Sequence, residues 1–167
     1  MAIRKILFDG DPILRKVSKP VVVFNQALIE LFDDMQETLD KQQGAGLSAV
    51  QIGVLKRMFI IMDGKTPVRI VNPEIISSSG TCKTTAEGCL SVPGKWGDVE
   101  RPNKVNVKYQ DQYGNFVENT FTGFTCKTFC HEYDHLQGIL FIDRATNLFN
   151  SYEEYHKFKL KQEKNKK

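Results

Sequence analysis

The sequence predicts a single α+β domain in which mostly antiparallel or mixed sheets pack around a central helix that carries two histidines. The length of 167 residues suits one domain. Segments with the apolar spacing of strands occupy the middle of the chain, whereas helical spacing appears near both ends. Strands grouped in this way, rather than alternating one by one with helices, are typical of antiparallel α+β architectures.

The first half of the chain is expected to form one helix and two strands. Apolar residues recur every three or four positions over 26–41, and Asn25 stands where a helix cap is needed. Residues 55–62 have the apolar run of a buried strand. Residues 68–76 predict another strand, broken at Pro73 because proline has no N–H for the ladder.

An antiparallel hairpin is expected next. Apolar and polar residues alternate over 104–110, a DQYGN turn follows, and residues 116–122 form the returning strand. One face of this hairpin should be buried.

Two helices and a short strand complete the expected fold. Helical spacing returns at Gly123 and ends at Gly138, a residue that often terminates helices. Residues 139–143 are expected to form a short strand. Ser151 and Glu154 match a capping box, which predicts the start of a C-terminal helix.

Composition favours a cytoplasmic protein. The chain has no apolar run long enough to span a membrane, and its N-terminus lacks the apolar core of a secretory signal. The four cysteines, at positions 82, 89, 126 and 130, include no Cys-x-x-Cys pair, so free thiols are expected. We also expect a monomer.

The net charge of +3 resides in the C-terminal stretch. Residues 151–167 contain six lysines and three glutamates. The simplest interpretation is that 157–167 form a frayed, solvated basic tail of the single domain. The alternative is that the lysines contact an anionic partner such as RNA.

The sequence CHEYDHLQG, at 130–138, predicts a metal site. Successive residues of a helix are rotated by about 100°, so His135 lies about 40° from His131 and one turn further on. Both imidazoles can therefore reach one point, with Glu132 beside it. This is the arrangement in which two histidines bind a catalytic metal and the glutamate serves as general base.

The third ligand is expected to come from elsewhere in the chain. A catalytic site needs three protein ligands, but Cys126 and Cys130 lie on other faces of the same helix. Downstream, Asp143 and Glu153 are only loose candidates.

Two further stretches are modest signals when each is considered alone. In EGCLSVPG, at 87–94, a glycine precedes Cys89 and lets the backbone approach a ligand closely. The stretch GAGLSAVQIG, at 44–53, is not a P-loop, because it lacks the Gly-Lys-Ser/Thr ending. Its glycines could expose backbone groups to an extended peptide.

Taken in order, the motifs GxGLxAxQ, EGCLS and HExDHLxG closely resemble those of peptide deformylase. The resemblance covers nearly the whole chain and implies hydrolysis of the N-formyl group from the formylmethionyl end of newly made proteins. It implies one divalent metal, Fe(II) in the cell, whereas mixed sulfur and nitrogen ligands also accept Zn(II), Ni(II) or Co(II). The resemblance implies nascent chains as the substrate, and a contact of the basic tail with the ribosome is the hypothesis that follows from it.

The resemblance also implies a role for each site residue. Cys89, His131 and His135 would bind the metal, and Glu132 would act as general base and then general acid. The Gln51 side chain and the Leu90 N–H would hold the formyl oxygen. The residues implied in substrate binding are Gly44, Ala45, Gly46 and Gly88 along the peptide backbone, and Phe124, Lys127 and Thr128 in the methionine pocket.

Two positions depart from the family pattern. Ser48 stands where alanine is usual, and its hydroxyl needs a partner if it is buried. Lys127 puts a cation in a pocket that is mostly apolar in the family, so its ammonium should reach water while its stem is buried.

Three rival interpretations remain open. A catalytically silent relative would have the same motifs but an altered pocket. A metal-dependent endopeptidase would cleave unformylated peptides and would give Cys89 no role. A structural zinc module in an RNA-binding protein would need a closed site with four ligands.

Overall fold

The computed structural model describes residues 1–83 and 86–166, without the side chains of residues 82 and 83. The helices are η1 (Pro12–Arg15), α1 (Gln26–Gln42), η2 (Ala49–Ile52), α2 (Gly123–Leu136), α3 (Phe141–Arg144) and α4 (Tyr152–Asn165). The strands are β1 (Gly46–Ser48), β2 (Met58–Asp63), β3 (Thr66–Lys83), β4 (Glu87–Cys89), β5 (Val92–Asp98), β6 (Glu100–Gln110), β7 (Phe116–Thr122) and β8 (Thr146–Phe149).

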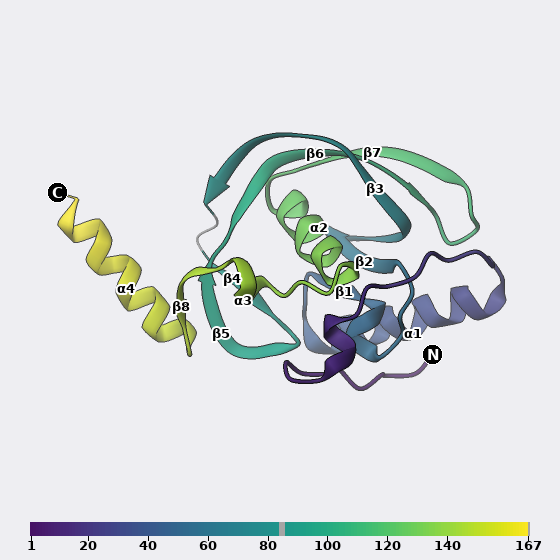
Figure 1. Cartoon of the computed structure of the whole chain (residues 1–167), viewed down its shortest axis with the longest axis horizontal. Helices are drawn as coiled ribbons and strands as arrows, with labels where there is room; N and C mark the ends of the chain where they lie inside the picture. Colours follow the sequence, from purple (N-terminus) through teal and green to yellow (C-terminus); the bar gives the residue numbers. More distant parts are fainter. Residues whose placement is uncertain (84–85, 167) are drawn as a thin grey trace.

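Two antiparallel sheets confirm the predicted α+β class. The larger sheet has the strand order β1-β2-β3-β6-β7, and the smaller has the order β4-β5-β8. In Figure 1, β3, β6 and β7 curve over α2, which lies at the centre of the molecule. The first turn of α4 adjoins β8, and the rest of the helix projects away from the body.

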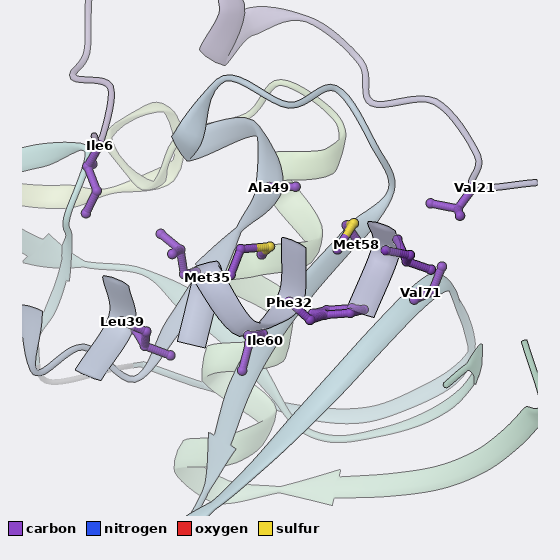
Figure 2. Packing of buried hydrophobic residues seen from close by; sticks show 11 residues of the cluster. Ile6, Val21, Phe32, Met35, Leu39, Ala49, Met58, Ile60 and Val71 are labelled. Carbon is purple, nitrogen blue, oxygen red and sulfur yellow. The ribbon is translucent and has the colours of Figure 1, made fainter. Parts of the chain in front are cut away.

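The large sheet separates two layers of apolar packing. Met58 and Ile60 of β2 face α1, where they meet Phe32, Met35 and Leu39 (Figure 2). The alternate residues Phe59 and Ile61 belong to the cluster that also contains Phe129 of α2. Because successive side chains of a strand point to opposite faces, a strand buried on both faces has a continuous apolar run. This explains the sequence MFIIM and fixes α2 firmly against the sheet.

Several predicted elements are confirmed. Helix α1 occupies nearly the predicted range, and the Asn25 side chain accepts a hydrogen bond from the Leu28 N–H. The hairpin β6–β7 is antiparallel and pairs Val105 with Phe121. Ser151 caps α4 by accepting a hydrogen bond from the Glu154 N–H at 3.1 Å.

The strand predicted at 139–143 is wrong. This stretch contains the first residues of α3, and the strand follows later as β8. The Leu140 N–H donates to the Asp143 carboxylate at 3.0 Å, which stabilises the start of a helical turn. Leu140 and Phe141 are buried with Leu14 and Val92. A short apolar run fits a buried turn of helix as well as a strand, so its pattern misled the prediction.

The predicted break at Pro73 is also wrong. Strand β3 continues through this residue, and its pairing with β6 shifts in register between Val71 and Glu74. Asn72 adopts a φ of 50° there, and its side chain bonds the backbone N–H and C=O of Val21 at 2.8 Å. An irregularity of this kind accommodates a proline, which has no N–H to donate.

The basic C-terminal segment belongs to α4, which is helical up to Asn165; residue 167 lies outside the described part, and fraying of 157–167 stays a prediction. The helix is attached near its start. Asp98 of β5, 1% exposed, accepts hydrogen bonds from the Tyr155 hydroxyl at 2.5 Å and from the Lys159 ammonium. A buried carboxylate needs such partners. Asp98 therefore fixes α4 to the small sheet.

Gly138 illustrates how tightly α2 is terminated. It has a φ of +74°, and a Cβ there would lie 2.5 Å from the Arg15 backbone oxygen. We expect Gly138→Ala to lower the free energy of unfolding by about 2 kcal/mol or more, because it combines a strained φ with overpacking against backbone. Urea unfolding measures the change. Gly64→Ala is the matched control, since Gly64 has a φ of +63° and nothing within 4 Å of the added Cβ. If both variants lost the same free energy of unfolding, the part of the prediction that rests on the clash with Arg15 would be contradicted.

Candidate metal centre and substrate cavity

Three side chains from two elements converge at the centre of the molecule. Cys89 ends β4, and His131 and His135 lie one turn apart on α2. Their ligand atoms all lie within 4.8 Å of one another, and Cys89 Sγ is 3.3 Å from His135 Nε2. This is the only such group of histidine, cysteine and carboxylate side chains in the described part of the chain.

The donor set fits a divalent metal. His131 Nδ1 contacts Glu87 Oε1 at 2.6 Å, which leaves its Nε2 as the ring nitrogen for a metal. His135 is fully buried, and its Nδ1 has no hydrogen-bond partner among the described residues. One thiolate and two imidazoles form the three-ligand set that catalytic sites use, with a further position left open.

The two histidines have pKa values shifted in opposite directions. Burial opposes protonation of His131, but the Cys89 thiol and Glu87 outweigh it and raise the pKa of His131 well above its usual value. For His135, burial and the neighbouring His131 lower the pKa well below its usual value. A neutral imidazole has a free ring nitrogen, so the environment of His135 suits metal coordination.

His131 contacts a buried network of charged residues through Glu87. Burial alone would raise the pKa of Glu87, but hydrogen bonds from His131 and Arg101 lower it to about 2. Arg101 is 4% exposed; it donates to Glu87 at 2.6 and 3.3 Å and to Asp134 of α2 at 2.6 Å. Glu87 therefore remains a carboxylate that orients the imidazole, and Arg101 links β6 to both β4 and α2.

Glu132 follows His131 on α2, lines the same cavity and is 2% exposed. Burial is the main reason that its pKa is raised above its usual value. Its Oε2 lies 2.7 Å from the Ser48 hydroxyl. A buried carboxylate with an elevated pKa is typical of a group that exchanges protons during a reaction.

Gln51 is oriented by contacts at both ends of its amide. The Ser48 N–H donates to Gln51 Oε1 at 2.8 Å, so the amide nitrogen points the other way. That nitrogen lies 3.1 Å from Ser91 Oγ and 3.6 Å from Cys89 Sγ. Gln51 thus lines the cavity with a donor close to the Cys89 sulfur.

These residues surround a cavity of about 610 Å³. The sequence-predicted site residues that line it are Gly44, Ala45, Gly46, Gln51, Gly88, Cys89, Leu90, Phe124, Lys127, Thr128, His131 and Glu132. His135 does not line the cavity and lies fully buried next to Cys89. The structure thus brings all of the predicted site residues into one region.

The two departures from the family pattern have defined partners. Ser48 is buried, and its hydroxyl contacts Glu132. The Lys127 ammonium donates to the Ala86 carbonyl oxygen and lies 5.5 Å from the centre of the Phe124 ring. Lys127 is half-buried, so its charge is held against a carbonyl oxygen and an aromatic face.

The other proposed ligands lie elsewhere. Cys126 is buried and donates to the Pro102 carbonyl oxygen, and burial raises the pKa of Cys130 to about 12. Asp143 pairs with Arg15, and Glu153 pairs with Lys157. The group of side chains that could hold a metal takes its third member, Cys89, from β4 rather than from the helix.

Sequence reasoning missed the residues that support the site. Glu87 opens the EGCLS motif, so a search for a carboxylate partner of His131 could have found it. Arg101 lies in a strand with no motif around it, and no local signal marks it. Trp96 of β5 was also missed; its ring packs against Gly88, where an added Cβ would lie 3.0 Å from the indole.

A model of the polypeptide deformylase family matches residues 3–150. The chain belongs to the polypeptide deformylase family. A peptide deformylase of Caldicellulosiruptor bescii is 48% identical over 153 residues, which make up 92% of each chain. The reaction of this deformylase is therefore the hydrolytic removal of the N-formyl group from newly made proteins.

Solved structures agree with this assignment. The peptide deformylase of Thermotoga maritima superimposes with a TM-score of 0.85 at 39% identity, over 87% of this chain and 99% of that one. The enzyme of Legionella pneumophila has a TM-score of 0.84 at 42% identity, over 96% and 98%. In the part of this deformylase that the structure describes, no helix is both long and apolar enough to cross a membrane.

Gly46 leaves no room for a side chain next to Glu132. A Cβ at Gly46 would lie 2.7 Å from Glu132 Oε1 and 3.0 Å from Thr128 Cγ2. Glu132 would have to move, and a displacement of about 1 Å at a catalytic group can cost about 10²-fold. We expect Gly46→Ala to lower kcat by that order with the bound metal unchanged, as steady-state kinetics and elemental analysis will show. Gly64→Ala serves as control, and wild-type kcat in Gly46→Ala would contradict the prediction.

Proposed function

We propose that this deformylase binds one divalent metal ion through Cys89, His131 and His135, with Fe(II) as the ion used in the cell and Zn(II), Ni(II) or Co(II) as substitutes. The observation that carries the proposal is that one potential ligand atom from each of the three residues lies within 4.8 Å of the others, with Glu132 next to His131 on α2. A divalent ion there would act as a Lewis acid and make water a stronger nucleophile near neutral pH.

Side chains and one backbone group of the protein transfer the proton and stabilise the developing charge. Glu132 takes a proton from the attacking water, and the oxygen forms a bond to the formyl carbon. Negative charge then develops on the formyl oxygen, where the Gln51 amide and the Leu90 N–H donate hydrogen bonds. Glu132 returns the proton to the substrate nitrogen as the C–N bond breaks. The products are formate and a free amino terminus.

The substrate occupies the cavity as an extended peptide. Backbone groups of 44–46 and of Gly88 lie along the cavity and are suited to pair with it. The methionine side chain enters between Phe124, Lys127 and Thr128, which lie on one face of α2. Because Lys127 donates to the Ala86 oxygen, it forms a polar edge of this pocket.

Location and partners follow from the substrate. A deformylase that acts on nascent chains works in the cytoplasm, and the domain acts as a monomer. The exposed lysines of α4, on the helix that projects from the body in Figure 1, provide a basic surface for ribosomal RNA.

Formate release from formyl-Met-Ala-Ser tests the proposal. The protein is purified without oxygen and loaded with Fe(II) or Ni(II), and Cys89→Ala is treated in the same way. We expect one metal ion per chain and formate from the wild type, and loss of bound metal from Cys89→Ala, because the remaining imidazoles are a weaker ligand set. Unchanged metal content in Cys89→Ala would contradict the ligand assignment.

The same assay separates the rival functions. Cleavage inside an unformylated peptide, read by mass spectrometry, would support an endopeptidase. A wild-type protein that holds one metal ion and releases no formate would be a catalytically silent relative.

A further inference from the structure

Ser48 is the last residue of β1, directly before the short helix that carries Gln51. Its side chain is fully buried, and its neighbour in β2 is Phe59. A buried hydroxyl costs free energy unless it has a partner. The partner of this hydroxyl shows what the residue contributes.

The Ser48 hydroxyl is directed at Glu132. Its oxygen lies 2.7 Å from Glu132 Oε2 and 3.1 Å from the Glu132 backbone oxygen. A serine hydroxyl has one hydrogen, and hydrogen bonds to a carboxylate are the shorter and stronger ones. The Ser48 hydroxyl therefore donates its hydrogen to the Glu132 carboxylate.

The two oxygens of Glu132 consequently have different surroundings. Ser48 holds Oε2 on one side. The other oxygen, Oε1, lies against Gly46 at the cavity wall, where there is room for a glycine only. The glutamate side chain is thus fixed at one oxygen while the other stays next to the substrate space.

Ser48 also contacts Gln51, but through its backbone. The Ser48 N–H donates to Gln51 Oε1, a contact that any residue other than proline would make at this position. Only the hydroxyl depends on serine. Replacement by alanine therefore removes the contact with Glu132 and leaves the orientation of Gln51 intact.

We propose that Ser48 is a positioning residue, which fixes one carboxylate oxygen of Glu132 so that the other stays aimed at the reacting water and nitrogen. The inference rests on the proposed role of Glu132 as general base and acid. It gives the serine a function in this chain, where the family pattern has alanine.

A double-mutant cycle tests the proposal on the metal-loaded enzyme. Ser48→Ala should lower kcat for formyl-Met-Ala-Ser by about tenfold, the size of one charge-assisted hydrogen bond, and leave KM unchanged. In a Glu132→Ala background, the same replacement should cost nothing further, because the group that Ser48 holds is gone. If Ser48 had only a structural role, Ser48→Ala would lower kcat by the same factor in the wild-type and Glu132→Ala backgrounds.

A second readout does not depend on activity. The carboxylate stretching band of Glu132 in the zinc-loaded enzyme is identified by its loss in Glu132→Ala, and it should shift in Ser48→Ala. An unshifted band, an unchanged kcat or an equal loss in both backgrounds would each overturn the proposal. If the wild type released no formate, the proposed function would fail; if only the Ser48→Ala results failed, that function would stand.

Discussion

Replacing Glu132 with glutamine is expected to lower kcat by about 10²–10⁴-fold, the usual contribution of a general acid–base group. Glutamine has the size of glutamate and can still accept the Ser48 hydrogen bond, but it cannot take and return a proton. Because none of the three predicted ligand atoms belongs to Glu132, the variant should keep one metal ion per chain. Formate release and elemental analysis on the same sample measure both quantities.

The control for this experiment is Glu153→Gln. Glu153 lies on α4, with its side chain 79% exposed and paired with Lys157 of the same helix. Its replacement makes the same chemical change at a residue that does not line the cavity, and it should leave kcat unaltered. Near-normal turnover in a metal-loaded Glu132→Gln protein would contradict the mechanism.

Replacing Arg101 with methionine is expected to lower the free energy of unfolding by about 3–5 kcal/mol, because the change removes the buried positive charge between Glu87 and Asp134. Arg101 donates to Glu87 and Asp134 within the network that supports His131. Methionine has a similar length and fills the space, so the loss reports on charge and hydrogen bonding. Urea denaturation of the metal-loaded protein measures it.

Arg144→Met provides a matched comparison. Arg144 donates to the same Asp134 carboxylate at 2.7 Å, but its side chain is 47% exposed. Exposed ion pairs contribute about 0–1 kcal/mol, so this variant should be close to the wild type. Similar losses for the two arginines would show that burial does not decide the strength of this network.

The sequence alone was sufficient to predict the centre of the site. His131, Glu132 and His135 lie on one regular helix, whose geometry fixes their relative directions. The angular argument placed Cys126 and Cys130 away from the two histidines, and neither belongs to the group formed by Cys89, His131 and His135. The hairpin could be predicted because its alternation is regular. These predictions succeeded because each depends on residues close together in the chain.

The features that escaped prediction depend on distant contacts. Ser48 and Glu132 are separated by 84 positions, and Arg101 and Asp134 by 33. Local periodicity contains no information about such pairs. The error at 139–143 has a related cause. Leu140 and Phe141 are apolar because they pack in the core, and that requirement is the same for a strand and for a turn of helix.

Trp96 is an intrinsic fluorescent probe of the cavity. It is the only tryptophan in the chain, it lines the cavity next to Gly88, and its ring meets Tyr152 of α4 edge to face at 5.2 Å. Indole emission responds to changes in the polarity around the ring. A peptide that enters the cavity displaces water from one side of this indole, so fluorescence titration can follow ligand occupancy without a label and without turnover.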